Sequence, residues 1–176
     1  MVEKWWNMTP RRKLLLLAAV GIVVILGYYG IRPLFFTPSY PDDFQIVFKY
    51  GVGARNILNT SAGTYTKDLI LDPSVTINLT FTEREMDTIW RFIQENEFYT
   101  IEEQSPPRAS AVQPEYKYSL HIRAEGYPDR ELTMTYLGFN TEPNEEAFYM
   151  IATKIREFIE AKPAYKKLPA PRGGYA

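Results

Sequence analysis

The sequence predicts an α+β domain with a mostly antiparallel sheet, two amphipathic helices packed on one face of it, and one transmembrane helix before it. Three features of the 176 residues carry this prediction: a long uncharged apolar segment, several runs of alternating apolar and polar residues, and two segments with apolar residues at helical spacing. Alternating strands punctuated by helices are typical of antiparallel α+β domains. The residues after the apolar segment suffice for one hydrophobic core.

The apolar segment, residues 14–31, contains no charged residue. At about 1.5 Å per residue, a helix of this length spans roughly 27 Å, close to the thickness of a bilayer core. Aromatic residues stand near both of its ends, as in the two interfacial belts of membrane helices: Trp5, Trp6, Tyr28, Tyr29, Phe35 and Phe36. We therefore expect residues 14–31 to anchor the chain in the plasma membrane.

The flanking cations predict the orientation of this single-pass anchor. Arg32 follows it closely, whereas four cations precede it: Lys4, Arg11, Arg12 and Lys13. By the positive-inside rule, residues 1–13 are cytoplasmic and the domain is extracytoplasmic. The alternative is a cleaved secretory signal, which usually has a shorter apolar region and small residues at its cleavage site. Bulky or charged residues lie between Gly27 and Pro33, so we expect a signal anchor that stays uncleaved.

Proline and glycine positions divide the rest of the chain. Residues 32–43 read as a short stiff linker, residues 44–162 as the domain, and residues 163–176 as an extended or loosely docked tail. Within the domain, alternation predicts strands at residues 44–50, 64–70, 75–81, 116–123 and 131–136. The 64–70 run is the weakest of these. Turn residues at 51–53, 72–74 and 126–129 separate the strands.

Two helices are predicted between these strands. Thr82 and Glu85 have the spacing of a capping box, and apolar residues follow at helical spacing up to Ile93, so the first helix begins at Thr82 and fades near Asn96. The second runs from about residue 143 to 160. Trp90 and Phe148 lie on the apolar stripes and are expected in the core. Residues 101–115, which contain three prolines, are expected to form a surface loop.

Charge and cysteine content narrow the classes of partner. Five of the 20 Lys and Arg residues lie in the first 36 positions, but only one of the 21 Asp and Glu residues does. The domain is therefore acidic, which argues against nucleic acid as a partner. Without cysteine the chain has neither disulfides nor cysteine lipidation.

Motifs that carry chemistry are weak in this sequence. His121 is the only histidine and is expected to be solvated on a strand. Gly51 and Gly53 begin like a phosphate-binding loop, but Asn56 replaces the third glycine, so a turn is expected. An acidic cluster lacks the spacing of a calcium loop: Asp68, Asp72, Glu83, Glu85 and Asp87. We therefore expect no catalytic residues, no metal site and no cofactor.

Polar residues on the two strands of the predicted hairpin form the candidate binding surface. If both helices cover one face of the sheet, the polar positions lie together on the other face: Lys117, Ser119, His121, Arg123, Glu131, Thr133 and Thr135. A flat surface of mixed charge can make a modest, wet and salt-dependent contact. Simple solvation of this face is the alternative.

Several short segments resemble a group of known proteins. They are Tyr50 to Gly53, Asn56 to Thr60, Gly63 to Asp68, Tyr165 to Pro169 and Gly173 to Tyr175. Together they resemble small uncharacterised extracytoplasmic proteins of Gram-positive, spore-forming bacteria, many of which are lipoproteins. The resemblance implies a setting at the bacterial cell envelope and supplies no catalytic residues. This chain departs from the lipoproteins because it has no lipidation cysteine and carries an apolar segment instead.

These observations predict a non-catalytic interaction module, held at the cell surface by residues 14–31, with a protein or a cell-wall polymer as its partner. The alternative is a cell-envelope hydrolase that uses carboxylates near Asp68 and Asp72, because paired carboxylates can hydrolyse glycosidic bonds.

Overall fold

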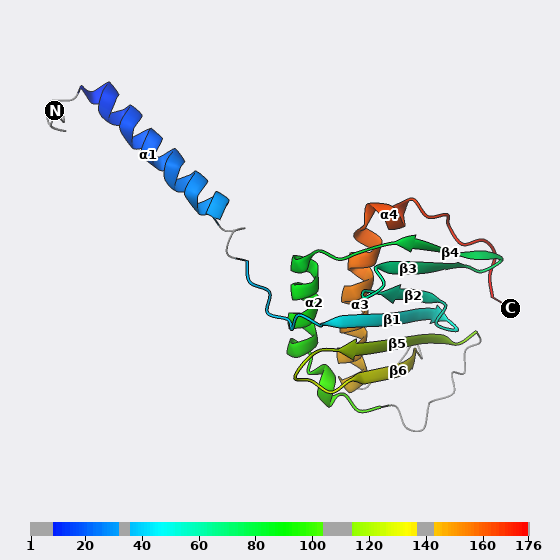
Figure 1. Ribbon diagram of the computed structural model, residues 1–176. Helices are drawn as coiled ribbons and strands as arrows, with labels where there is room; N and C mark the ends of the chain where they lie inside the picture. The colour runs from blue at the N-terminus through cyan, green and yellow to red at the C-terminus, as the bar shows by residue number, and fades with distance from the viewer. Residues whose placement is uncertain (1–8, 32–35, 104–113, 137–142, 176) are drawn as a thin grey trace. The chain divides into compact units, whose positions relative to one another are not determined.

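A computed structural model describes residues 9–31, 36–103, 114–136 and 143–175 (Figure 1), with the side chains of residues 24–31, 136, 143 and 144 left out of the description. The chain divides into two units, residues 1–37 and 38–176. Several sequence predictions fall outside the described residues, namely those on Lys4, Trp5, Trp6, Arg32, Phe35 and most of the 101–115 loop.

The first unit contains one helix, α1 (Pro10–Ile31). Its described side chains end at Val23, and the large apolar ones among them are exposed, with Leu14 and Leu15 each 70% accessible. Over the residues that the structure describes, no helix combines the length and apolarity needed to cross a membrane.

The second unit is built on a six-stranded sheet with the order β4-β3-β2-β1-β5-β6, in which all neighbouring strands are antiparallel. The strands are β1 (Gln45–Val52), β2 (Asn56–Asn59), β3 (Thr64–Leu69), β4 (Asp72–Asn78), β5 (Tyr116–Arg123) and β6 (Arg130–Tyr136). With the helices described next, this architecture confirms the predicted α+β class and antiparallel sheet.

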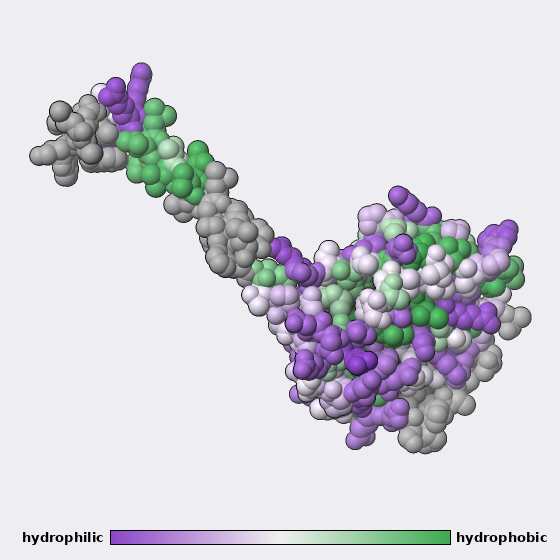
Figure 2. Space-filling view, in the orientation of Figure 1, coloured by the Kyte–Doolittle hydropathy of each residue, from purple (hydrophilic) through white to green (hydrophobic). Residues whose placement is uncertain are grey.

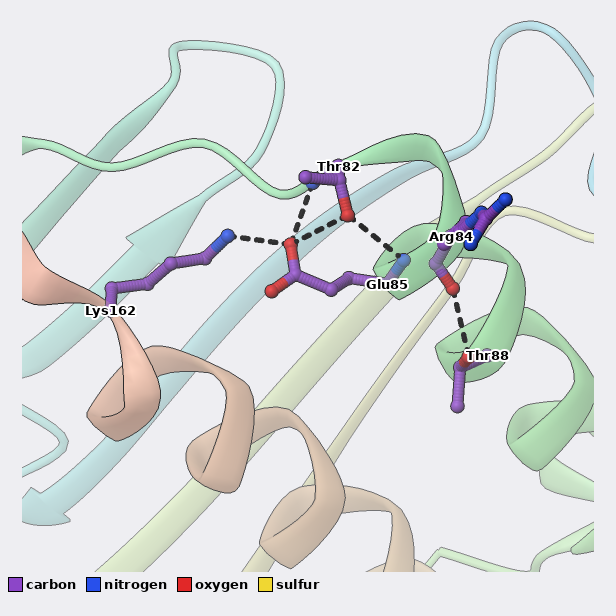
Figure 3. Close-up of polar contacts among 5 residues, drawn as sticks. All are labelled: Thr82, Arg84, Glu85, Thr88 and Lys162. Carbon is purple, nitrogen blue, oxygen red and sulfur yellow. Dashed lines mark hydrogen bonds and ion pairs between the residues drawn. The ribbon is translucent and has the colours of Figure 1, made fainter. Parts of the chain in front are cut away.

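The helices of this unit are α2 (Glu83–Glu95), the short 3-10 helix η3 (Phe98–Thr100), α3 (Pro143–Ala161) and α4 (Pro163–Lys166). The predicted capping box begins α2. The Glu85 backbone N–H donates to Thr82 Oγ1 at 3.3 Å, and the Thr82 N–H donates back to Glu85 Oε2 at 2.7 Å. Glu85 Oε2 also accepts from Lys162 Nζ at 2.5 Å, so the first turn of α2 is tied to the end of α3 (Figure 3).

One hydrophobic core joins α2 and α3 to a single face of the sheet. Along β1, Ile46, Phe48 and Tyr50 are buried, whereas Val47 and Lys49 between them are half-buried. In Figure 1, α3 passes behind the strands and α2 stands beside it. Core residues from the helices and their partner strands form one cluster: Ile89, Trp90, Ile93, Phe148, Ile151, Ile155, Ile159, Leu120, Ile122, Leu132 and Met134. The expectation that Trp90 and Phe148 belong to the core is confirmed.

The structure differs from the sequence analysis between residues 56 and 81. Strand β2 was not predicted, because it has four residues and only Leu58 is buried. Strand β4 ends at Asn78, before Phe81, and begins at Asp72, so the predicted turn at 72–74 is wrong. The chain turns at Ile70 and Leu71, and Ile70 has a φ of 66°. Pro73 is compatible with a strand because β4 lies at the sheet edge.

Candidate functional site

The strand register brings the predicted surface residues together on the face opposite the core. Between β1 and β5, Lys49 is paired with Ser119 and Gln45 with Arg123. Between β5 and β6 the pairs are Lys117 with Thr135, Ser119 with Thr133, and His121 with Glu131. We call this group of residues on β1, β5 and β6 the polar face. In Figure 2, hydrophilic residues gather over β5 and β6, and paler residues cover β2 to β4.

Side chains of the polar face hold one another in place. Ser119 Oγ donates to Glu131 Oε1 at 2.6 Å, and Lys49 Nζ lies 3.8 Å from the same oxygen. His121 Nε2 contacts Asp129 Oδ1 in the turn that precedes β6. Sequence reasoning missed Lys49 and Asp129. The alternation of β1 placed Lys49 on the polar side of that strand. Its pairing with Ser119 on β5 could not be known until the strand order was known.

Exposure differs among the predicted surface residues. Arg123, Glu131 and Thr133 are exposed, and Lys117 and His121 are half-buried. Ser119 and Thr135 are only 5% and 6% accessible. The solvent-accessible side chains of this face are therefore mainly charged, together with Thr133, because the Ser119 and Thr135 hydroxyls are covered.

The carboxylates of the hydrolase alternative bind the C-terminal tail. Asp72 accepts from Arg172 Nε at 2.7 Å, and this hydrogen bond holds the pKa of Asp72 below its ordinary value. Asp68 is buried and accepts from the Ile70 N–H at 3.1 Å and from the Tyr175 hydroxyl. Arg172 also donates its backbone N–H to the Leu69 carbonyl at 3.3 Å. Both carboxylates therefore anchor the tail.

Two further acidic residues of the cluster, Glu85 and Asp87, have structural partners near the start of α2. Asp87 accepts from both the backbone N–H and the hydroxyl of Ser39, each at 2.7 Å, and from Arg91 Nε at 3.1 Å. Burial alone would raise the pKa of Asp87, but these Ser39 and Arg91 contacts lower it. Within the described part of the chain, no three His, Cys, Asp or Glu side chains gather as a metal site.

Two adjoining hollows lie at the end of the inner sheet face where β1 ends and β5 begins. The first encloses about 260 Å³, and Tyr50, Tyr165 and Tyr175 are among its lining residues. The second encloses about 380 Å³, and its lining includes Tyr118 and Tyr149. Both are lined by Tyr116 and Arg156, so these two residues form a shared wall. We call the pair of hollows the tyrosine trough.

A hydrogen-bond network around Asn56 supports the first hollow. Asn56 Nδ2 donates to the Tyr50 carbonyl at 3.1 Å, and Asn56 Oδ1 accepts from the Asp68 N–H at 3.1 Å. The side chain thus bridges β1 and β3. Gly51 has a φ of 99°, and a Cβ atom there would stand 2.7 Å from Asn56 Nδ2. Glycine at this position therefore serves close packing against Asn56 rather than phosphate binding.

Two buried tyrosine hydroxyls lie beside this network. Tyr50 Oη and Tyr65 Oη are 2.7 Å apart, so each satisfies the other inside the core. Burial raises the pKa of both phenols, which keeps them neutral, so that one hydroxyl can donate its hydrogen to the other. Tyr50, which lines the first hollow, therefore contributes an uncharged side chain to it.

The charged residues of the trough offset one another. Arg156 Nε lies 3.2 Å from Glu160 Oε1. Burial works against the charge of Arg156, but nearby Tyr118 and Glu160 outweigh it and raise its pKa. Lys67 Nζ lies 4.8 Å from the centre of the Tyr165 ring. With Asp68, the first hollow thus combines two cations and two anions among the described residues.

Sequence reasoning missed the trough. Its only sequence signal was the excess of tyrosine, with 13 tyrosines against ten phenylalanines, and the Tyr116 and Tyr118 pair on one strand face. Comparison with known protein families found no matching family model. Comparison with curated proteins likewise found no matching sequence.

Proposed function

We propose that this chain is a membrane-tethered interaction module on the outer face of a bacterial plasma membrane, and that it docks a protein partner through the polar face. The proposal of a tether is supported by the uncharged residues 14–31, by the helical backbone of α1 and by the cations before it. The exposed leucines at the start of α1 would be costly in water and favourable in lipid.

The observation that carries the docking proposal is the pre-ordered mixture of charge on the polar face. Glu131 accepts a hydrogen bond from Ser119 at 2.6 Å and lies 3.8 Å from Lys49 Nζ, and His121 contacts Asp129. Side chains already held in place lose little conformational freedom when a partner binds. Both signs of charge are present, so a partner with complementary charges gains specificity and faster association rather than large affinity.

The hydrolase alternative lacks comparable support. A pair of catalytic carboxylates must reach a substrate bond from two sides. Asp68 and Asp72 are instead occupied by Tyr175 and Arg172 of the tail.

Topology is tested by adding protease to cells from which the wall has been removed. The proposal expects digestion of the domain after Tyr40 and protection of the residues before Leu14. A protected domain would reverse the orientation. A mature protein shorter by about the first 30 residues would replace the anchor with a cleaved signal.

Docking is tested by crosslinking in intact cells, with partners identified by mass spectrometry. The variant replaces His121 and Arg123 by serine, and the matched control replaces Arg84 and Gln94, which are exposed on α2. The proposal expects partners to be lost from the first variant alone. An unchanged partner profile, in a variant of unchanged thermal stability, would remove the polar face from consideration.

A further inference from the structure

We propose that the tyrosine trough is a second binding site, and that its ligand is an uncharged glycan strand of at least two sugar units. This inference goes beyond docking at the polar face. It concerns other residues, at the opposite surface of the sheet, and does not depend on where the chain is located.

The lining of the trough combines rings with hydrogen-bonding groups. A sugar ring presents C–H bonds on its two faces and hydroxyls around its edge. Tyrosine rings can cover the C–H faces, and phenol, amide and guanidinium groups can bind the edge. Tyr116, Tyr165 and Tyr175 supply rings, while Asn56 and Arg156 supply planar polar groups. Purely apolar ligands fit this lining poorly because they would leave its polar atoms without partners.

The charge of the trough selects against ionic ligands. Arg156 is paired with Glu160, and Lys67 and Asp68 contribute one charge of each sign. An anionic ligand would have to compete with Glu160 for Arg156, and a cationic ligand would meet Arg156 and Lys67 directly. A neutral ligand instead accepts hydrogen bonds from these cations without separating the existing pair.

The division of the trough predicts more than one sugar unit. Its hollows enclose about 260 and 380 Å³ and meet at Tyr116 and Arg156. A single small ring fills one hollow and leaves the second empty. Two linked rings would occupy both and share the contacts of the wall between them, so an oligomer gains binding energy that a monomer lacks.

The C-terminal tail completes one side of the first hollow. Tyr175 lines it, its hydroxyl is held by Asp68, and its ring lies 5.8 Å from Arg55. These contacts fix a ring at the edge of the site before any ligand arrives. Because the tail also reaches Asp72 through Arg172, its position is set independently of the ligand.

The test uses the full chain in detergent micelles and titration calorimetry with the N-acetylglucosamine tetramer as the probe. The proposal expects the tetramer to bind at least about tenfold more tightly than the monomer and than the deacetylated, cationic tetramer. Absence of tetramer binding would overturn the proposal. Tighter binding of the cationic tetramer would overturn the claim of a neutral ligand.

Variants then locate the binding site. Arg156→Gln and Tyr116→Ala should each weaken tetramer binding by about tenfold. Tyr116→Phe keeps the ring and should keep most of the affinity. If Tyr116→Ala fails to fold, Arg156→Gln still locates the site, because Arg156 lines the same two hollows. Arg123→Gln on the polar face is the matched control and should bind normally. If Arg123→Gln loses binding while Arg156→Gln retains it, the glycan belongs to the polar face and the trough is not its site.

Discussion

The two ends of the inner sheet face follow the same alternating pattern but pack differently. Where β1 begins and β5 ends, the paired residues Ile46 and Ile122 are completely buried beneath the helices. Where β1 ends and β5 begins, the paired residues Tyr50 and Tyr118 lie instead beside the hollows of the tyrosine trough.

The difference arises from the polar tips of the tyrosines. An isoleucine can be enclosed on all sides at no cost, but a buried phenol must find a hydrogen-bond partner. Tyr50 and Tyr65 satisfy each other and are buried. Tyr116 and Tyr165 are only half-buried, and their surroundings stay open. An aliphatic stripe therefore closes a core, whereas a stripe of tyrosines can leave a site.

Replacing one ring at each end by alanine should distinguish the two ends of the sheet face most clearly, through the loss in free energy of unfolding. Phe148→Ala removes a completely buried ring from α3 and should lower the free energy of unfolding by about 3–5 kcal/mol, through lost burial and a cavity. Tyr116→Ala should cost less than half as much, because that ring is half-buried beside the hollows. Urea denaturation monitored by circular dichroism measures both. Equal losses would mean that the trough is packed as tightly as the core.

Removing single hydroxyls should sharpen the contrast among the tyrosines themselves. Tyr65→Phe leaves Tyr50 Oη buried without its 2.7 Å partner and should cost about 1–2 kcal/mol. Tyr165→Phe at the open trough should cost under about 0.5 kcal/mol, because Tyr165 is half-buried and water can take the place of its hydroxyl. The double variant Tyr50→Phe and Tyr65→Phe should be more stable than the sum of the two single losses predicts. Additive losses would contradict a direct hydroxyl pair.

A smaller effect is expected for the ion pair between Glu85, in the first turn of α2, and Lys162, just after α3. Burial would raise the pKa of Glu85, but Lys162 and Thr82 lower it, so the folded state favours the charged form. The stabilisation is therefore complete above the ordinary pKa of 4.5 and disappears as the pH falls through the lower pKa of the folded protein. Glu85→Gln should cost about 1 kcal/mol at pH 7 and nothing below that lower pKa. Glu83→Gln, two residues earlier and exposed, is the control. A cost independent of pH would show that charge is not involved.

Local signals were enough to predict the helices and the clearest strands. The capping box marked the start of α2, and alternation marked β1, β5 and β6, because those patterns act between residues close in sequence. Strand β2 was not predicted, because its stability comes from the strands on both sides of it rather than from its own four residues. The transmembrane role of residues 14–31 stays a prediction.

The two candidate sites, the polar face and the tyrosine trough, also differ in how far the sequence could predict them. The residues of the polar face on β5 and β6 could be predicted, since strand alternation decides which side chains point away from the core. Lys49 on β1 could not be added before the strand order was known. The tyrosine trough could not be predicted, because its walls meet only through the fold: Tyr175 reaches Asp68 across 107 positions and Arg172 reaches Asp72 across 100. No spacing rule anticipates contacts of that separation.

The smallest expected effect concerns the tail that closes the trough. Arg172 is largely exposed, so Arg172→Gln should leave the unfolding midpoint unchanged, because exposed ion pairs contribute little. The same variant should nevertheless loosen the tail locally, since Arg172 binds both Asp72 and the Leu69 carbonyl. Faster hydrogen exchange at the Arg172 amide, with unchanged exchange in β1, would reveal this local release. Tyr175→Phe removes the contact with buried Asp68 and should accelerate the same amide further. If Arg172→Gln instead lowers the midpoint, the tail belongs to the cooperative core, and the trough is closed by the fold itself rather than by a separately docked segment.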